Sequence, residues 1–295
     1  MITGQDLWDW QQQAKQTAAA VSVDPGEVDW LLQGLIGLDR LSLRLGTYRG
    51  QGAIATQWDR AALDRLWQQR LEARVPVQYL AGQMVWRHLR LMVGPAVLIP
   101  RPETELMIEI ACEQVAQSSP LATGVWVDLG TGSGAIALGL AQALPGAIVH
   151  GVDCSAAALA IARQNGELNG LSDRVTWHHG PWWHPLHHQA GTIAAMVSNP
   201  PYIPSRDLAQ LQPEVRDHEP HLALDGGDDG LTALRHLITT APQFLKPDGL
   251  WLVELMAGQA PTVADLLRAQ GQYHRIQLYS DLAGIERFVL AYTLP

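Results

Sequence analysis

The sequence predicts an α/β protein in which a small helical domain precedes a larger domain with a mostly parallel sheet covered by helices on both faces. Three observations support this fold class. The chain has 295 residues, which suits two domains better than one. Apolar residues repeat at helical spacing before residue 75. Strand and helix patterns alternate after residue 103, as is typical of a parallel sheet packed between helices.

Composition narrows the classes of function. Hydrophobic residues make up 47% of the chain and charged residues 17%, which favours a large core and argues against disorder. A net charge of -9 repels phosphate backbones, so we expect no direct nucleic-acid binding. Cys112 and Cys154 fit neither a metal site nor a disulfide framework. With no signal pattern and no membrane-spanning apolar run, we expect a cytoplasmic protein that does not bind membranes. We also expect a monomer.

Two helices can be placed in the N-terminal region. Asp24 is expected to cap the first, with Pro25 in its first turn and Glu27 reaching back to the cap amide. The second is expected over Trp58–Arg74 and ends before Pro76, because the residue before a proline disfavours the helical conformation. The apolar face of the first helix comprises Val28, Leu31, Leu32, Leu35 and Ile36.

A hairpin and a proline-rich linker follow. Apolar residues alternate over Met84–Val93, at Val85, Leu89, Leu91 and Val93, and predict a hairpin. Residues 96–102 form a linker that its prolines stiffen. We therefore expect a helical domain over residues 1–75, a hairpin and linker over 76–102, and an α/β domain over 103–295.

The larger domain is expected to alternate strands with helices, and its last two strands would form an antiparallel pair at the sheet edge. We expect helices over Glu103–Ala116, Ala135–Leu144, Ser155–Asn169, Leu231–Leu245 and Ala260–Ala269, and strands over Val125–Leu129, Ile148–Val152, Val175–His178, Ile193–Ser198, Leu250–Leu255, Tyr273–Leu278 and Arg287–Tyr292.

A glycine-rich loop follows the first of these strands and indicates a cofactor site. Its sequence is Gly130-Thr131-Gly132-Ser133-Gly134, and glycines allow both a sharp turn and close approach of a ligand to the main chain. The following helix offers free amide donors. The spacing differs from the dinucleotide pattern, which needs one more residue before the third glycine, and favours S-adenosylmethionine. Asp128 would orient the loop or meet the cofactor's ammonium group; the alternative is a tight turn without a ligand.

Two further residues are cofactor candidates. Asp153 ends the second strand, where an acid can bind both ribose hydroxyls. Its alternative role is to cap the helix that begins near Ser155. Trp182 follows the third strand and could pack on the adenine ring. The alternative is that Trp182 and Trp183 are core or rim tryptophans without a ligand.

The segment Asn199-Pro200-Pro201-Tyr202 follows the fourth strand and suits a planar amide or amino nitrogen as methyl acceptor. Such a nitrogen has two N–H donors, so two acceptors must hold it. We expect these to be the Asn199 side-chain oxygen and the Pro200 carbonyl, in a segment that its prolines keep rigid. Tyr202 would stack on the planar group. Catalysis would then rest on orientation, because the methyl donor is already activated. The alternative is a proline-rich turn without chemistry.

Together these segments resemble the release-factor glutamine methyltransferase family. The resemblance runs from Arg74 to the C-terminus and is most specific where a proline-rich linker motif is combined with Asn199-Pro200-Pro201-Tyr202. The other segments that carry it are Val75-Pro76-Val77-Gln78-Tyr79-Leu80-Ala81-Gly82, Leu98-Ile99-Pro100-Arg101-Pro102-Glu103-Thr104-Glu105, Asp128–Gly134, Glu219-Pro220, Ala223-Leu224-Asp225-Gly226-Gly227, Asp229-Gly230 and Asp281-Leu282-Ala283-Gly284.

The resemblance implies that the helical domain over residues 1–75 docks the protein substrate. It also implies that residues 103–295 form a Rossmann-like, seven-strand class I methyltransferase domain with S-adenosyl-L-methionine as cofactor; we expect no metal. Peptide chain release factors would be the protein partners, methylated on the glutamine amide of their Gly-Gly-Gln motif. Carried over by position, the contacts with the cofactor would be Gly130, Thr131, Gly132, Ser133, Gly134, Asp153, Trp182 and Asn199. The contacts with the substrate would be Asn199, Pro200, Pro201 and Tyr202, of which Asn199, Pro200 and Tyr202 would be catalytic.

Several points stay open. Pro181 replaces an acid that many family members have, and residues 255–258 replace a common glycine turn, which would reshape one wall of the pocket. Glu219 and Glu254 could contact the substrate or form salt bridges. The histidines of residues 178–188 favour a solvated loop over a metal site. Rival functions are an adenine amino-methyltransferase, a glutamine methyltransferase with another protein substrate, and a cofactor-binding domain without turnover.

Overall fold

A computed structural model describes residues 2–295, which form two compact units. Unit 1 comprises the described chain up to Met84, the short segment Val93–Pro95 and the distant segment Gln212–His218. Unit 2 comprises Val85–Met92, Ala96–Leu211 and Glu219–Pro295. Within these described residues, no helix is both long enough and apolar enough to cross a membrane.

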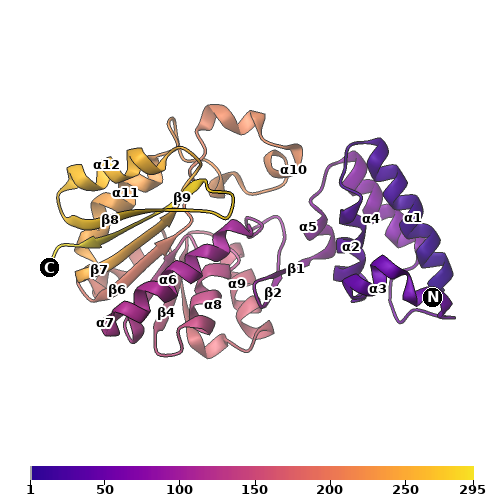
Figure 1. Ribbon diagram of the computed structural model, residues 1–295, viewed down its shortest axis with the longest axis horizontal. Coiled ribbons are helices and arrows are strands. Elements are labelled where there is room, and N and C mark those ends of the chain that lie inside the picture. The colour runs from indigo at the N-terminus through magenta and orange to yellow at the C-terminus, as the bar shows by residue number, and fades with distance from the viewer. Residues whose placement is uncertain (1) are drawn as a thin grey trace. The chain divides into compact units, whose positions relative to one another are not determined.

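Unit 1 is helical (Figure 1). Short polar side chains begin three of its helices by accepting backbone amides: Thr3 accepts from Asp6 N, Asp39 from Ser42 N and Asp59 from Ala62 N. The apolar faces meet in a core that includes Leu7, Trp10, Leu31, Leu63 and Trp67. The helices are α1 (Gly4–Ala20), α2 (Gly26–Ile36), α3 (Arg40–Leu45), α4 (Arg60–Glu72), α5 (Val77–Ala81) and, from the distant segment, α10 (Pro213–Arg216).

A buried arginine joins the distant segment to the helices of unit 1. Arg70 of α4 is 4% exposed; its Nη2 donates to Glu27 Oε1 at 2.8 Å, and its Nη1 lies 2.8 Å from Glu214 Oε1. The expected capping role of Glu27 is therefore wrong, because the guanidinium attracts the carboxylate away from the start of α2. Asp24 supports that start instead, since its Oδ1 accepts from Gly26 N at 2.8 Å.

Unit 2 contains a seven-stranded sheet with the order β5-β4-β3-β6-β7-β9-β8. Neighbouring strands are parallel except for β9, which runs antiparallel to both β7 and β8. This confirms the predicted fold class, including the antiparallel pair of C-terminal strands. The strands are β3 (Val125–Leu129), β4 (Ile148–Asp153), β5 (Val175–His179), β6 (Ile193–Ser198), β7 (Leu245–Glu254), β8 (Tyr273–Ser280) and β9 (Glu286–Thr293).

Helices cover both faces of this sheet (Figure 1). Leu234 and Leu237 pack with Val263 and Leu267 against one face, in a core that includes Trp251 of β7. On that face lie α11 (Thr232–Thr240) and α12 (Ala260–Gln270), and on the other lie α6 (Leu106–Gln117), α8 (Ala135–Ala143) and α9 (Ala156–Leu168), with the short α7 (Ser119–Ala122) between α6 and β3. The predicted helix over Leu231–Leu245 is too long, because Pro242 cannot donate a backbone hydrogen bond and the chain changes to a 3-10 turn.

The predicted hairpin is confirmed as a separate two-stranded sheet of β1 (Gln83–Trp86) and β2 (Leu89–Met92). Val85 of β1 faces away from the core and is 64% exposed. Trp86 takes the buried position, and its Nε1 donates to Arg101 O at 2.9 Å. Asn165 of α9 fixes the second strand, since its Oδ1 accepts from Met92 N at 2.6 Å.

Candidate active site

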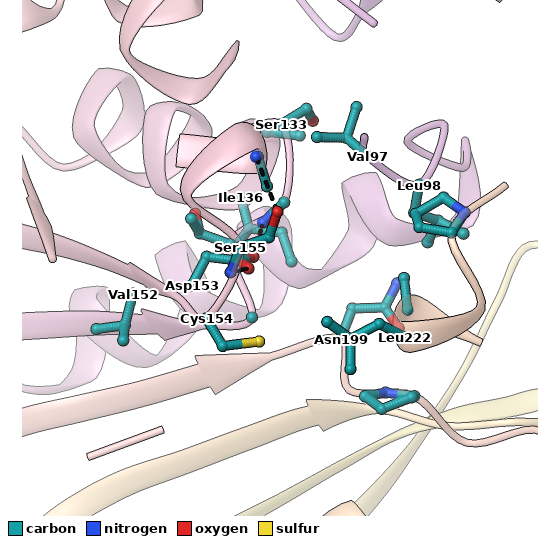
Figure 2. Close-up of a pocket in the computed structure, with 18 of the residues that line it drawn as sticks. Val97, Leu98, Ser133, Ile136, Val152, Asp153, Cys154, Ser155, Asn199 and Leu222 are labelled. Carbon is teal, nitrogen blue, oxygen red and sulfur yellow. Dashed lines mark hydrogen bonds between the residues drawn. The ribbon is translucent and has the colours of Figure 1, made fainter. Parts of the chain in front are cut away.

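A cavity of about 380 Å³ opens at the carboxyl ends of β3, β4 and β6 in unit 2. This is the edge at which parallel α/β sheets bind ligands. Figure 2 shows Asn199 beside Leu222, across the cavity from Asp153 and Ser155. The predicted site residues that line the cavity are Gly130, Thr131, Gly132, Ser133, Asp153, Trp182, Asn199 and Pro201.

The loop after β3 leaves its main chain open to the cavity. Gly130 and Gly132 have φ values of 76° and 55°, in the left-handed region that favours glycine. The amides of Gly130 and Thr131 both donate to Val152 O, at 2.9 and 3.0 Å, which holds the loop against β4. A Cβ added to Gly130 or Gly132 would meet no atom within 4 Å. A ligand can therefore approach the backbone with no side chain between them.

Gly134 has a different role from the one expected, because it does not line the cavity. A Cβ at this position would lie 2.8 Å from Trp177 Cη2 and 3.2 Å from Ala162 Cβ. Glycine is therefore needed for the start of α8 to pack against β5 and α9.

Asp128 holds the loop after β3 in place from its buried side. Its side chain is fully buried, and its Oδ2 accepts from Thr131 Oγ1 at 2.6 Å and from Ala137 N at 3.1 Å. Burial raises the pKa of Asp128 to about 7, against the lowering effect of these two hydrogen bonds. Of its two expected roles, the structure places Asp128 to orient the loop, since the side chain does not line the cavity.

Asp153 connects two walls of the cavity. Its Oδ2 accepts from Gly132 N and its Oδ1 from Ser155 N, both at 2.8 Å. The alternative role as helix cap is excluded, because Ser155 itself caps α9 by accepting from Ala158 N. Each carboxylate oxygen has two lone-pair sites, so each can accept one further hydrogen bond from a ligand hydroxyl.

The two neighbouring tryptophans point to different environments. Trp183 is 3% exposed and its Nε1 donates to Thr240 Oγ1 at 3.0 Å, so it belongs to the core. Trp182 lines the cavity together with Pro181 and has φ 46°, a left-handed conformation that is rare for a bulky residue. Such backbone strain concentrates at functional sites.

Asn199 follows the last residue of β6 and lines the cavity. The preceding Ser198 is buried and donates from Oγ to Leu129 O at 2.6 Å, which fixes the end of β6 beside the end of β3. Asn199 Nδ2 donates to Thr104 Oγ1 over 3.5 Å, so the linker before α6 reaches this segment. Pro200 is buried and lies outside the cavity lining, whereas Pro201 lines it.

A second glycine-rich loop supports the backbone at Tyr202. A Cβ at Gly226 would lie 2.8 Å from Tyr202 C, and one at Gly230 would lie 2.3 Å from Tyr202 O, so only glycine permits this approach. Gln259 Nε2 also donates to Tyr202 O, at 3.0 Å. Tyr202 itself does not line the cavity and packs against the core. The motif that contains these glycines forms part of the family resemblance, but no structural role could be predicted for it from the sequence alone.

Two buried acids lie outside the cavity lining. Glu219 is 4% exposed and accepts from Arg101 Nη2 at 2.6 Å, so its salt-bridge alternative is the one that the structure supports. Glu254 is 2% exposed at the end of β7, and burial raises its pKa to about 7. It does not line the cavity.

Comparisons with known proteins place the chain in a family. The methyltransferase small domain family matches residues 105–215. A release factor glutamine methyltransferase of Synechocystis sp. is 55% identical over 295 residues, which covers 99% of this chain and 98% of that one. The chain belongs to the release factor glutamine methyltransferase family. A protein of the same name from Gloeobacter violaceus is 47% identical and covers 96% of both chains.

A solved structure of lower identity supports the fold of this release factor glutamine methyltransferase family member. The hMettl16 catalytic domain aligns with a TM-score of 0.54 and 15% identity, over 83% of this chain and 85% of that one. At this identity the likeness concerns the class I methyltransferase fold alone.

As a member of this family, the protein is an S-adenosylmethionine-dependent methyltransferase, and the cavity fits that cofactor. The volume of about 380 Å³ lies within the range of small-molecule sites. The open space at Gly130 and Gly132 leaves room against the main chain, and the free lone pairs of Asp153 suit a pair of hydroxyls.

Part of the cavity wall was not anticipated. The linker supplies Val97, Leu98, Pro100 and Thr104, and the segment after Pro220 supplies Leu222 and Ala223. Leu255–Gly258 do not belong to the lining, so the expectation that they reshape a wall is wrong; Gln259 draws that turn toward Tyr202 instead. Within residues 2–295, no group of three or more His, Cys, Asp or Glu side chains could hold a metal ion.

Proposed function

We propose that this protein methylates the side-chain amide nitrogen of the glutamine in the Gly-Gly-Gln motif of peptide chain release factors. One observation carries the proposal: Asn199 and Asp153, predicted for the acceptor and the cofactor, line one cavity from opposite sides. Relatives with 55% and 47% identity, both called release factor glutamine methyltransferase, support the choice of substrate.

The chemistry requires an amide nitrogen to be held in place. Its lone pair is conjugated with the carbonyl, so it is a poor nucleophile unless it is close to the methyl group and in line with it. The Asn199 oxygen and the Pro200 carbonyl would accept its two N–H groups. Tyr202 would stack on the amide, and burial raises the pKa of Tyr202 above its usual range, so its ring stays uncharged.

The cofactor would lie along the loop after β3. Gly130, Thr131, Gly132 and Ser133 would face it with main-chain groups, Asp153 would accept from its ribose hydroxyls, and Trp182 would pack on its adenine ring. When bound, S-adenosylmethionine supplies a methyl group on a positively charged sulfur, which needs no further activation. The protein would therefore contribute by positioning the cofactor and the substrate amide and by excluding water.

Unit 1 is proposed to dock the protein substrate, with the enzyme acting as a monomer. Every predicted cofactor and acceptor residue belongs to unit 2, which leaves unit 1 without a share in the chemistry. Hydrogen exchange of the enzyme with and without a purified release factor tests this role. We expect protection of amides in α1–α5; protection confined to unit 2 would contradict it.

The substrate is tested by incubating the purified enzyme with labelled S-adenosylmethionine and a purified release factor, then locating the label by mass spectrometry. We expect label on the glutamine of the Gly-Gly-Gln motif and none when that glutamine is replaced by alanine. Label on another protein of a cell extract, or on adenine, would point to the rival functions.

A further inference from the structure

Thr104 lies between Asn199 and a buried carboxylate. Its Oγ1 accepts from Asn199 Nδ2 over 3.5 Å, and hydrogen bonding from the Thr104 side chain lowers the pKa of Glu254. Thr104 is 4% exposed and Glu254 is 2% exposed, so little water reaches the contact between these two side chains. The three side chains form a chain of contacts that begins at the cavity and ends inside unit 2.

Neither of the two nearby arginines forms an ion pair with Glu254. Arg287 Nε donates to Asp281 Oδ2 at 2.6 Å, and Arg101 Nη2 donates to Glu219 Oε1 at 2.6 Å, so both guanidiniums are bound to other acids. Glu254 Oε2 is buried and has no hydrogen-bond partner among the described residues. Burial of an acid without a paired cation is unfavourable, so its presence here points to a role other than stability.

We propose that Glu254, acting through Thr104, holds the Asn199 amide in the orientation that methyl transfer requires; this inference rests on the proposed function. A hydroxyl has a single hydrogen. When Thr104 donates it to Glu254, the Thr104 oxygen can only accept, and Asn199 must turn its NH2 group toward it. The Asn199 oxygen then points away from Thr104 and is free to accept an N–H of the substrate amide.

Without an acceptor at position 254, this orientation is no longer selected. The Thr104 hydroxyl could then donate to the Asn199 oxygen, and the amide would flip. The flipped amide would present its own N–H donors to the N–H donors of the substrate amide. No hydrogen bond would then hold the substrate nitrogen in place for methyl transfer. Thr104 and Glu254 are therefore positioning residues, and Asn199 is the group that touches the substrate.

The arrangement depends on the charge of Glu254. Burial raises the pKa of Glu254 to about 7, Thr104, Arg287 and Arg101 lower it, and Glu103 raises it. The Tyr202 hydroxyl, which also interacts with Glu254, stays protonated because burial raises its pKa. Below about pH 7 the carboxyl gains a proton and no longer requires the Thr104 hydrogen. The value of kcat should therefore rise with pH through this range.

The test measures kcat, KM and cofactor Kd for full-length Thr104→Val, Thr104→Ser and Glu254→Gln. Thr104→Val removes the hydroxyl at nearly constant shape and should lower kcat by roughly tenfold to a hundredfold, the effect of one lost hydrogen bond in a buried site. Thr104→Ser keeps the hydroxyl and should stay within about threefold of wild type on the same scale. Cofactor Kd should change little in all three. Glu254→Gln should lose the rise of kcat near pH 7.

A double-mutant cycle separates positioning from general damage. In the Asn199→Ala background, where no amide remains to be oriented, Thr104→Val should have almost no further effect on kcat. An equal loss in both backgrounds, or a Thr104→Ser variant as impaired as Thr104→Val, would overturn the proposal. The cycle can be run on whichever protein the wild-type enzyme methylates, so an incorrect substrate would be detected separately in the wild-type assay.

Discussion

Asp153 and Gly132 are joined by a 2.8 Å hydrogen bond in which the glycine amide donates to the carboxylate. The bond connects the end of β4 to the loop after β3. One side chain can therefore both shape the glycine loop and accept from a ligand, because each of its oxygens keeps a free lone pair.

Asp153→Ala should raise the Kd for S-adenosylmethionine by about tenfold to a hundredfold, because charge-assisted hydrogen bonds contribute roughly 1.5–3 kcal/mol. Asp153→Asn is the matched control, since it keeps a neutral acceptor for Gly132 and should bind with intermediate affinity. Calorimetric titration measures both. Wild-type affinity in the alanine variant would contradict the ribose assignment.

Asn199→Ala should lower the rate of methyl transfer by about 10²–10³-fold, by analogy with removal of one positioned polar group from an active site. Cofactor affinity should change much less. Asn199→Asp keeps an acceptor oxygen and should retain more activity than the alanine variant if acceptance alone matters. The measurement is methyl incorporation into a release factor at saturating cofactor, and near-wild-type turnover by Asn199→Ala would exclude the mechanism.

Asp128→Asn should change how stability depends on pH. The folded-state pKa of Asp128 is raised to about 7 from 3.8, so the folded protein binds an extra proton between these values. Its contribution to the free energy of unfolding is full below about pH 4 and is lost as pH rises through about 7.

Asparagine does not titrate and can keep the acceptor for Thr131 and Ala137. The variant should therefore be more stable than wild type at pH 8, with a smaller difference near pH 4. Thermal unfolding at both pH values checks this. A variant that is less stable at pH 8 would show that the charge of Asp128 is needed in the folded state.

Arg70→Met should destabilise unit 1, because Glu27 would lose its cation and Glu214 would keep Arg74 but lose its second partner. Loss of one partner of a fully buried ion pair typically costs about 3–5 kcal/mol, and the loss here should be smaller because both acids are partly exposed. Faster hydrogen exchange is expected in α2, α4 and α10, with cofactor Kd unchanged. The control carries Arg70→Met with Glu27→Gln and Glu214→Gln; it should recover much of the loss, and no recovery would exclude a charge effect.

Local patterns were sufficient to predict the sheet of unit 2 and the part of the cavity wall that the loop after β3 and the strand ends supply. The loop from Gly130 to Ser133 and the acids at strand ends are adjacent in sequence to the elements that position them. The packing role of Gly134 could not be predicted, because its close approach to Trp177 is a contact between elements that no local pattern contains.

Long-range contacts account for the other omissions. The support of Tyr202 by Gly226 and Gly230 depends on a parallel bridge between Ile203 and Asp225. The hydrogen bond from Asn199 to Thr104 joins residues that are 95 positions apart in the chain. Hydrophobic periodicity carries no information on such pairs, so Thr104 could be predicted as part of a motif but not as a neighbour of Asn199.

The discontinuous composition of unit 1 has a consequence for how the chain folds during synthesis. Glu214 pairs with Arg70 but leaves the ribosome long after it. The N-terminal helices therefore emerge with one partner of Arg70, Glu27, and without the second, Glu214. Domains generally fold in the order in which they are made. Here the first unit can be completed only when the chain has passed through β3–β6, so the N-terminal helices must wait in a partly assembled state.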